Sequence, residues 1–84
     1  LRIPGNTIDL RGQRVEEALD AVDRGLADAL ADGIRVVFVL HGHGTGALKQ
    51  AVRSALRGHP QVARHAPANS DQGGDAFTVI EVRA

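Results

Sequence analysis

The amino-acid sequence predicts an α/β fold, a two-layer sandwich in which two helices cover one face of a four-stranded mixed sheet. Residues 15–30 and 47–57 place apolar side chains at the helical repeat, with charged side chains opposite. Between them, residues 34–40 form a near-continuous apolar run, which is typical of a strand inside a parallel sheet. Shorter strand patterns are found at 7–11, 61–65 and 76–82. The predicted order of elements is therefore βαβαββ.

The first strand and the first helix begin a parallel crossover. Residues 7–11 alternate, so we expect Ile8 and Leu10 on the buried face and Asp9 and Arg11 on the opposite face. Glycine and glutamine end this strand before the helix begins. A strand, a helix and a second strand of these lengths predict a right-handed connection between two parallel strands.

The side-chain alternation of the second strand predicts a polar site at one edge of the sheet. Arg35 is poorly suited to burial under a helix, so residues 37, 39 and 41, which share its face, are expected on the side without helices. Asp9 and Arg11 are expected on that side too. Because the carboxyl ends of parallel strands meet at one edge, Asp9, Arg11 and His41 should converge there.

A glycine-rich turn follows the buried strand and opens the second helix. Glycine allows a positive φ and a close approach of the backbone to a ligand. The free N–H groups and the positive dipole end of the helix suit an anion. The sequence therefore predicts a phosphate cradle beside the imidazole of His41, formed by Gly42, His43, Gly44, Thr45 and Gly46.

Two nucleotide-binding motifs do not fit this turn. Gly42, Gly44 and Ala47 have the loose dinucleotide spacing, but the next strand at 61–65 offers no acidic residue for a ribose. A P-loop requires lysine directly after its last glycine, whereas Lys49 comes two residues later. No nucleotide cofactor is expected in this chain. A glycine-rich turn with solvated histidines and no chemistry is the alternative interpretation.

Charge is segregated along the chain, although the formal net charge is zero at pH 7. Residues 15–32 hold six acidic residues and one basic residue, whereas residues 41–70 hold no acidic residue and all four histidines. This asymmetry indicates that an anionic partner binds to the second half of the chain.

A basic ridge is expected on the second helix, because Lys49, Arg53 and Arg57 recur every four residues. We expect this ridge to contact nucleic-acid phosphates, and the alternative is that it is only a solvated face. Only two aromatic residues are present, which argues against a base-stacking surface.

Length and composition indicate one small domain. We expect residues 1–6 to be a lead-in linker and residues 7–84 a single domain, cut from a longer protein because Leu1 is not preceded by methionine and methionine is absent. Cysteine is absent, which excludes disulfides and Cys-based zinc sites. The apolar run 36–40 is too short for a membrane span or a signal peptide. We expect a soluble, cytoplasmic domain without a membrane partner.

Four motifs in order resemble the Smr (small MutS-related) domain. They are Ile8-Asp9-Leu10-Arg11-Gly12, the glycine-rich turn, His59-Pro60-x-Val62, and Gly73-Gly74 before the last strand. The form with Arg11 looks like the one that ends the second, recombination-linked class of bacterial MutS proteins, which implies a parent protein with a MutS-like ATPase that dimerises. The resemblance covers nearly the whole chain and implies a fold similar to the C-terminal domain of translation initiation factor three.

The resemblance also implies a nucleic-acid endonuclease domain that nicks phosphodiester bonds in branched or structured DNA. The family's functional positions correspond to Asp9, Arg11, His41, Gly42 and Gly44. Many members carry histidine in place of Arg11, so we expect Arg11 to clamp the scissile phosphate rather than to move protons. His41 is expected to act as general base or acid, with Asp9 orienting it or holding Mg²⁺ or Mn²⁺.

Three alternatives stay open at this point. The domain could cleave RNA, as other members of the resembled family do, or it could anchor a protein to nucleic acid or to a ribosome without cutting. The absence of a strong nucleophile keeps the anchor open as an alternative to the endonuclease. A protein-interaction domain that uses the acidic first helix is the third alternative.

Overall fold

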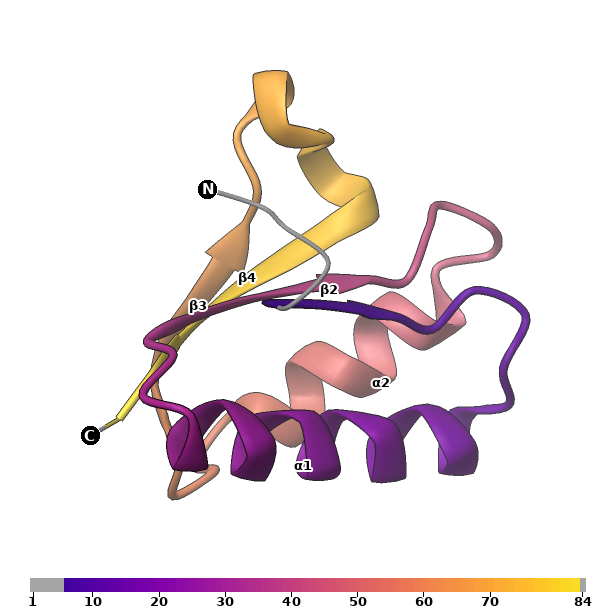
Figure 1. The fold of residues 1–84 in the computed structure, drawn as a ribbon. Coiled ribbons are helices and arrows are strands. Elements are labelled where there is room, and N and C mark those ends of the chain that lie inside the picture. Colours follow the sequence, from indigo (N-terminus) through magenta and orange to yellow (C-terminus); the bar gives the residue numbers. More distant parts are fainter. Residues whose placement is uncertain (1–5, 84) are drawn as a thin grey trace.

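The computed structural model describes residues 6–83 and confirms the predicted α/β fold. Its elements are β1 (Thr7–Asp9), α1 (Val15–Ala31), β2 (Val36–Leu40), α2 (Ala47–Leu56), β3 (Val62–Pro67), the short 3-10 turns η2 (Ser70–Gln72) and η3 (Gly74–Ala76), and β4 (Phe77–Val82). Both helices lie on one face of the sheet (Figure 1). Among residues 6–83, no helix has the length and apolar character needed to cross a membrane.

The lead-in linker predicted at residues 1–6 lies outside the described residues, apart from Asn6. The Asn6 side-chain amide donates a hydrogen bond of 3.2 Å to the Val36 carbonyl oxygen. Asn6 is thereby tied to the start of β2 and not only to its own neighbours in the chain.

The sheet has the strand order β1-β2-β4-β3. β1 and β2 pair in parallel, as predicted, with Ile8 opposite Val39. β4 lies between β2 and β3 and runs antiparallel to both. β3 is therefore an edge strand, and an irregularity between Val62 and Arg64 bends its pairing with β4. The parallel pair at the other side brings the ends of β1 and β2, and the loops that follow them, to one edge.

The main hydrophobic core lies between the sheet and the two helices. It joins the inward side chains of the strands to the apolar stripes of α1 and α2. Its buried members are Leu10, Ala18, Val22, Leu26, Ala29, Val37, Val39, Val52, Leu56, Val62, Ile80 and Val82. Complete burial of each leucine, isoleucine or valine contributes about 1.5–3 kcal/mol, so this core, rather than the exposed ion pairs, stabilises the fold.

The predicted orientation of β2 is wrong. Val37 and Val39 pack in the core under the helices, and His41 continues the same buried row instead of facing the side without helices. The prediction relied on Arg35, which precedes the first residue of β2 and is exposed. Its Nε donates to the Val82 carbonyl oxygen at 3.3 Å. The polarity of Arg35 therefore carries no information about which face of β2 is buried.

The face of the sheet away from the helices is partly covered by the connection between β3 and β4. This segment contains the two 3-10 turns and extends beyond the ends of β3 and β4, on the side away from the helices (Figure 1). Phe38, Ala68 and Phe77 form a second, smaller apolar cluster there. The two phenylalanines of the chain are thus core residues, which agrees with the expectation that they do not stack on bases.

Candidate functional site

Two loops meet at one edge of the sheet and enclose a cleft of about 670 Å³. Residues 11–15 of the β1–α1 loop and residues 41–48 of the β2–α2 loop line this cleft, which we call the Gly-rich cleft. Because β1 and β2 are parallel, both helices begin beside it (Figure 1). Arg11, Arg14 and His43 are among its lining residues, and no acidic side chain is. Helix N-termini and cations together favour an anionic ligand.

The glycine-rich turn presents its backbone to this cleft. Gly42, Gly44 and Gly46 have φ angles of 76°, 41° and 85°, which residues with a side chain rarely adopt. Within residues 6–83, the backbone N–H groups of His43, Gly44 and Thr45 make no hydrogen bond. Consecutive unpaired N–H groups at the start of a helix form the concave donor set that binds phosphate oxygens. The turn thus has the geometry of the predicted cradle, and phosphate binding by it stays a prediction.

Arg11 and Asp9 form an exposed ion pair beside the cleft. Nε and Nη2 of Arg11 donate to the two carboxylate oxygens of Asp9 at 3.0 and 2.8 Å, and the Arg11 backbone N–H donates at 3.1 Å. The side-chain hydrogen bonds from Arg11 lower the pKa of Asp9 below its usual value, so the carboxylate stays ionised at neutral pH. Arg11 keeps about three of its five guanidinium N–H groups for another partner. Its stem passes Gly42, where a Cβ would lie 3.5 Å from Cγ of Arg11.

His41 is buried at the base of the turn, with 5% of its surface exposed. Its Nδ1 lies 3.0 Å from the Gly42 carbonyl oxygen and its Nε2 lies 2.9 Å from Oγ1 of Thr78. Because a carbonyl oxygen only accepts, we assign the proton to Nδ1, and Nε2 then accepts from the Thr78 hydroxyl. Nε of Arg53 donates to the same hydroxyl oxygen at 2.9 Å. This His41–Thr78–Arg53 chain ties the turn to β4 and α2.

The environment of His41 favours the neutral ring. Burial lowers the pKa of His41, the hydrogen bond to the Gly42 carbonyl opposes that effect, and the nearby charge of Arg53 lowers the pKa further. Protonation would also place a second donor against the Thr78 oxygen that already accepts from Arg53. Both ring nitrogens are engaged inside the protein, so proton exchange with a ligand would require the bond to Thr78 to break.

The predicted convergence of Asp9, Arg11 and His41 is only partly realised. Arg11 and His41 both border the Gly-rich cleft. Asp9, however, bonds to Arg11 on the face without helices, whereas the His41 ring bonds to Gly42 and Thr78. The expectation that Asp9 orients His41 is therefore wrong, because β2 is turned the other way round.

His43 is the imidazole that reaches the solvent at this site. It is exposed, it lines the Gly-rich cleft, and its side chain has no hydrogen-bond partner within the described part of the chain. The sequence placed His43 in the cradle. Strand alternation could not have distinguished it from His41, because positions 41 and 43 fall on the same face of a strand and only the turn that begins at Gly42 separates the two rings.

The donor set does not form a protein-built metal site. Residues 6–83 contain no group of three His, Asp or Glu side chains that could hold a metal ion. Asp9, the predicted ligand of Mg²⁺ or Mn²⁺, has both carboxylate oxygens hydrogen-bonded to Arg11. A divalent ion there would have one protein ligand and would have to displace Arg11. We therefore assign no reaction step to a metal.

The predicted basic ridge is divided in two. Lys49 and Arg53 contact the carboxylate of Asp75 at 2.6 and 3.0 Å and are only 27% and 20% exposed. Hydrogen bonds from Lys49, and then from Arg53, lower the pKa of Asp75, so its charge offsets theirs. Arg57, at the end of α2, is exposed and has no side-chain partner within residues 6–83. Of the three ridge residues, only Arg57 presents a charge without a partner among residues 6–83 to the solvent.

Sequence reasoning missed Thr78, Arg14 and Asp75. Residues 78, 80 and 82 of β4 point into the core, and Thr78 is the one polar residue among them. Because a buried hydroxyl requires hydrogen-bond partners, the alternation along β4 could have indicated that Thr78 bonds to a polar side chain. Arg14 occupies the N-cap position of α1, and its backbone N–H donates to the Glu17 carboxylate at 3.1 Å. The Arg14 guanidinium makes no hydrogen bond within residues 6–83 and can therefore reach a ligand in the cleft. Asp75 gave no local signal, because its partners lie far away in the chain.

Comparison with known proteins agrees with this architecture. The family profile of the Smr domain matches residues 8–83. The chain belongs to the Smr family. The crystal structure of the Smr domain of Thermus thermophilus MutS2 superposes on this Smr domain with a TM-score of 0.92 and 46% identity, covering 94% of this chain and 99% of that chain. YdaL, a stand-alone small MutS-related protein from Escherichia coli, superposes with a TM-score of 0.89 and 26% identity, covering 98% of this chain and 67% of that chain.

Longer relatives of this Smr domain are named Endonuclease MutS2. The Clostridium botulinum (strain Loch Maree / Type A3) protein is 40% identical over 83 residues, which are 99% of this chain and 10% of the relative. The protein of Anaeromyxobacter sp. (strain Fw109-5) is 47% identical over 76 residues, which are 90% of this chain and 9% of the relative. The chain thus spans about a tenth of the length of these relatives. Their names support a nuclease or nucleic-acid-binding role at the level of the family.

Proposed function

We propose that this Smr domain binds the backbone of branched or structured DNA in the Gly-rich cleft and nicks a phosphodiester bond there. One observation carries the proposal: a single cleft without an acidic lining residue is surrounded by groups that attract anions. These groups are the unpaired N–H groups of the turn, the starts of two helices and the side chains of Arg11, Arg14 and His43. Such a site fits a phosphate. The kinship with proteins named Endonuclease MutS2 supports the reaction class.

Arg11 is assigned the grip on the scissile phosphate. Its remaining guanidinium N–H groups offer the paired donors that bind two phosphate oxygens and stabilise the charge that develops on them. Asp9 acts as a positioning residue, because its carboxylate holds Nε and Nη2 of Arg11 and leaves the rest of the guanidinium free. This role replaces both the metal-binding and the histidine-orienting roles first expected of Asp9.

Proton transfer is assigned to His43. Hydrolysis forms a bond from phosphorus to the oxygen of water and breaks the bond to one sugar oxygen, so one proton leaves the water and one reaches the departing oxygen. The exposed His43 ring has a nitrogen free to accept the proton that leaves the attacking water, and solvent supplies the proton that the departing sugar oxygen takes up. His41 holds the turn in place through Gly42 and Thr78, which makes it a positioning residue.

Lys49, Arg53 and Arg57 are proposed to serve binding in different ways. Lys49 and Arg53 anchor Asp75, and Arg53 also anchors Thr78, so they support the turn more than they contact a ligand. Arg57 is available for a phosphate. We also propose that the domain works in the cytoplasm as part of a longer, dimeric protein that carries a MutS-like ATPase. The relatives named Endonuclease MutS2, about ten times longer than this chain, support the longer protein.

The test is a cleavage assay with a labelled four-way DNA junction, a linear duplex and a structured RNA, each with and without EDTA. We expect nicks in the junction, a reduced rate for His43→Gln and an unchanged rate for Arg24→Gln, a matched substitution on the outer face of α1. Binding of all three without any cut would establish a nucleic-acid anchor instead. Cleavage of the RNA alone would make the domain an RNA endonuclease.

A further inference from the structure

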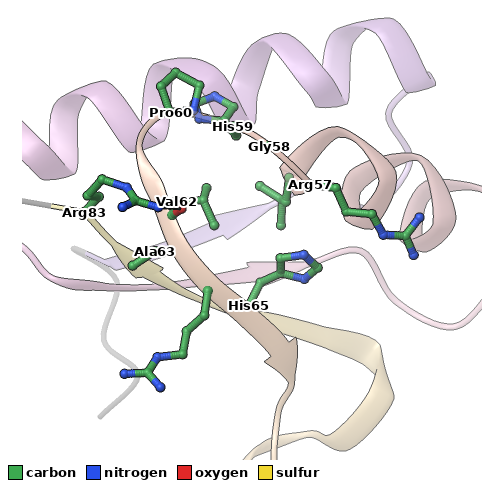
Figure 2. Close-up of a pocket in the computed structure, with 10 residues that line it drawn as sticks. Arg57, Gly58, His59, Pro60, Val62, Ala63, His65 and Arg83 are labelled. Carbon is green, nitrogen blue, oxygen red and sulfur yellow. Dashed lines mark hydrogen bonds between the residues drawn. The ribbon is translucent and has the colours of Figure 1, made fainter.

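A second basic cleft lies at the opposite end of α2 from the Gly-rich cleft. Its volume is about 590 Å³, and it is bordered by the end of α2, the loop to β3, the edge strand β3 and the residue after β4 (Figure 2). We call it the edge-strand cleft. Its cationic lining residues are Arg57, Arg64 and Arg83, with His59 and His65 beside them, and no acidic side chain lines it.

Two of these five side chains are already engaged. Nε of Arg64 donates to a carboxylate oxygen of Glu81 at 2.8 Å, which offsets its charge. Nε2 of His59 lies 2.9 Å from Asp23, and its Nδ1 accepts from the Gln61 backbone N–H at 3.1 Å. Arg64 and His59 therefore serve the fold itself.

The other three side chains are available to a ligand. Nη2 of Arg83 donates to the Val62 carbonyl oxygen at 3.1 Å, which fixes the guanidinium near the start of β3 without neutralising it. Arg57 and the half-buried His65 have no side-chain partner within the described residues. In Figure 2, Arg83 lies at the start of β3, while His65 and Arg57 lie farther along toward α2. Within residues 6–83, two guanidinium groups without an acidic partner and one imidazole without a hydrogen-bond partner thus border a single cleft.

The balance of charge favours an anion at this place. The C-terminal dipole of α2 contributes about half a negative charge, which two guanidinium groups outweigh. Charged side chains on an edge strand also prevent sheets from joining, but Arg57 and Arg83 lie outside β3, so that role does not account for them. No Phe, Tyr or Trp side chain is among the residues that line the cleft, which suits a phosphate better than a base.

We propose that the edge-strand cleft binds the sugar–phosphate backbone of the nucleic acid whose scissile phosphate occupies the Gly-rich cleft. This inference rests on the proposed function. α2 has 10 residues and separates the two clefts by about 15 Å at 1.5 Å per residue. That length equals the rise of about four base pairs of B-DNA. The domain therefore grips its substrate at two places, one for cleavage and one for affinity.

Fluorescence anisotropy with a labelled 20-base-pair duplex, titrated at several salt concentrations, tests this proposal. We expect Arg57→Gln combined with Arg83→Gln to weaken binding about tenfold and to lower the slope of log K against log salt by about one to two units, because up to two phosphate contacts are lost. Arg57→Lys retains the positive charge, so we expect its slope of log K against log salt to equal that of the parent. Arg24→Gln on α1 is the matched control and should bind like the parent.

The outcomes separate the two proposals. Parent-like affinity and slope in the double variant, together with weakened binding by Arg11→Gln, would remove the edge-strand cleft and leave the proposed function intact. A parent chain that binds neither the duplex nor a four-way DNA junction even at low salt would overturn both. Because Arg83 also holds Val62, a measurement on the unaltered protein complements the variants: the ring-proton resonances of His65 should shift when the duplex is added, and unchanged resonances would count against the cleft.

Discussion

At the scale of single residues, Asp9 and Arg11 act as one unit. Both side chains are largely exposed, so their pairing adds little to stability and its value lies in orientation. We expect Asp9→Asn to lower kcat by about tenfold with little change in KM, because Arg11 would lose a charged partner that fixes its geometry. Steady-state nicking at increasing Mg²⁺ distinguishes the roles. Recovery of the rate at high Mg²⁺ would show that Asp9 holds a metal after all.

His41 predicts a pH dependence of stability. Its pKa is lower in the folded protein than the ordinary value of 6.5, so the unfolded chain binds more protons as the pH falls below that value. The contribution of the neutral ring is present above pH 6.5 and is lost as the pH falls toward the lowered pKa. Between about pH 7.5 and about pH 5.5, the parent should therefore lose more free energy of unfolding than His41→Gln. Urea titrations at both pH values measure this, and parallel losses would contradict it.

At the scale of elements, the glycine-rich turn depends on a polar contact with β4. Thr78→Val keeps the shape of the side chain but removes the hydroxyl that Nε2 of His41 and Nε of Arg53 share. Two buried polar atoms would lose their partner, which costs about 1–3 kcal/mol of the free energy of unfolding. Thermal unfolding checks the stability. Amide exchange should accelerate at His41 and Gly42, whose N–H groups donate to the Ala76 carbonyl oxygen. A variant as stable as the parent, with unchanged exchange in the turn, would mean that β4 does not anchor it.

Most elements could be predicted from the sequence because their signals are local. The apolar stripes of α1 and α2, the apolar run of β2 and the glycines of the turn each identify an element within a few residues. The orientation of β2 could not be predicted, because Arg35 precedes the strand and bonds to Val82 across the sheet. The clamp of Lys49 and Arg53 on Asp75 was equally hidden, since it joins residues that only the tertiary fold brings together.

At the scale of the whole molecule, the charge distribution divides the surface by function. No acidic side chain of α1 lines either cleft, although Asp23 pairs with His59 beside the edge-strand cleft. Within residues 6–83, unpaired cations border the Gly-rich cleft at the start of α2 and the edge-strand cleft at its end. A chain with no net charge can therefore attract a polyanion at two places while its acidic face repels it elsewhere. The orientation of bound DNA follows from this division.

Single-turnover nicking of a saturating four-way DNA junction by Arg11→Gln tests the central claim most directly. Arg11 is 63% exposed at its side chain, so the variant should fold like the parent, and Arg24→Gln serves as the control. Loss of a preorganised donor to the phosphate predicts a rate lower by about 10²–10³-fold at saturation. Nicking by Arg11→Gln at the parent rate would contradict the assignment of the Gly-rich cleft as the place of cleavage.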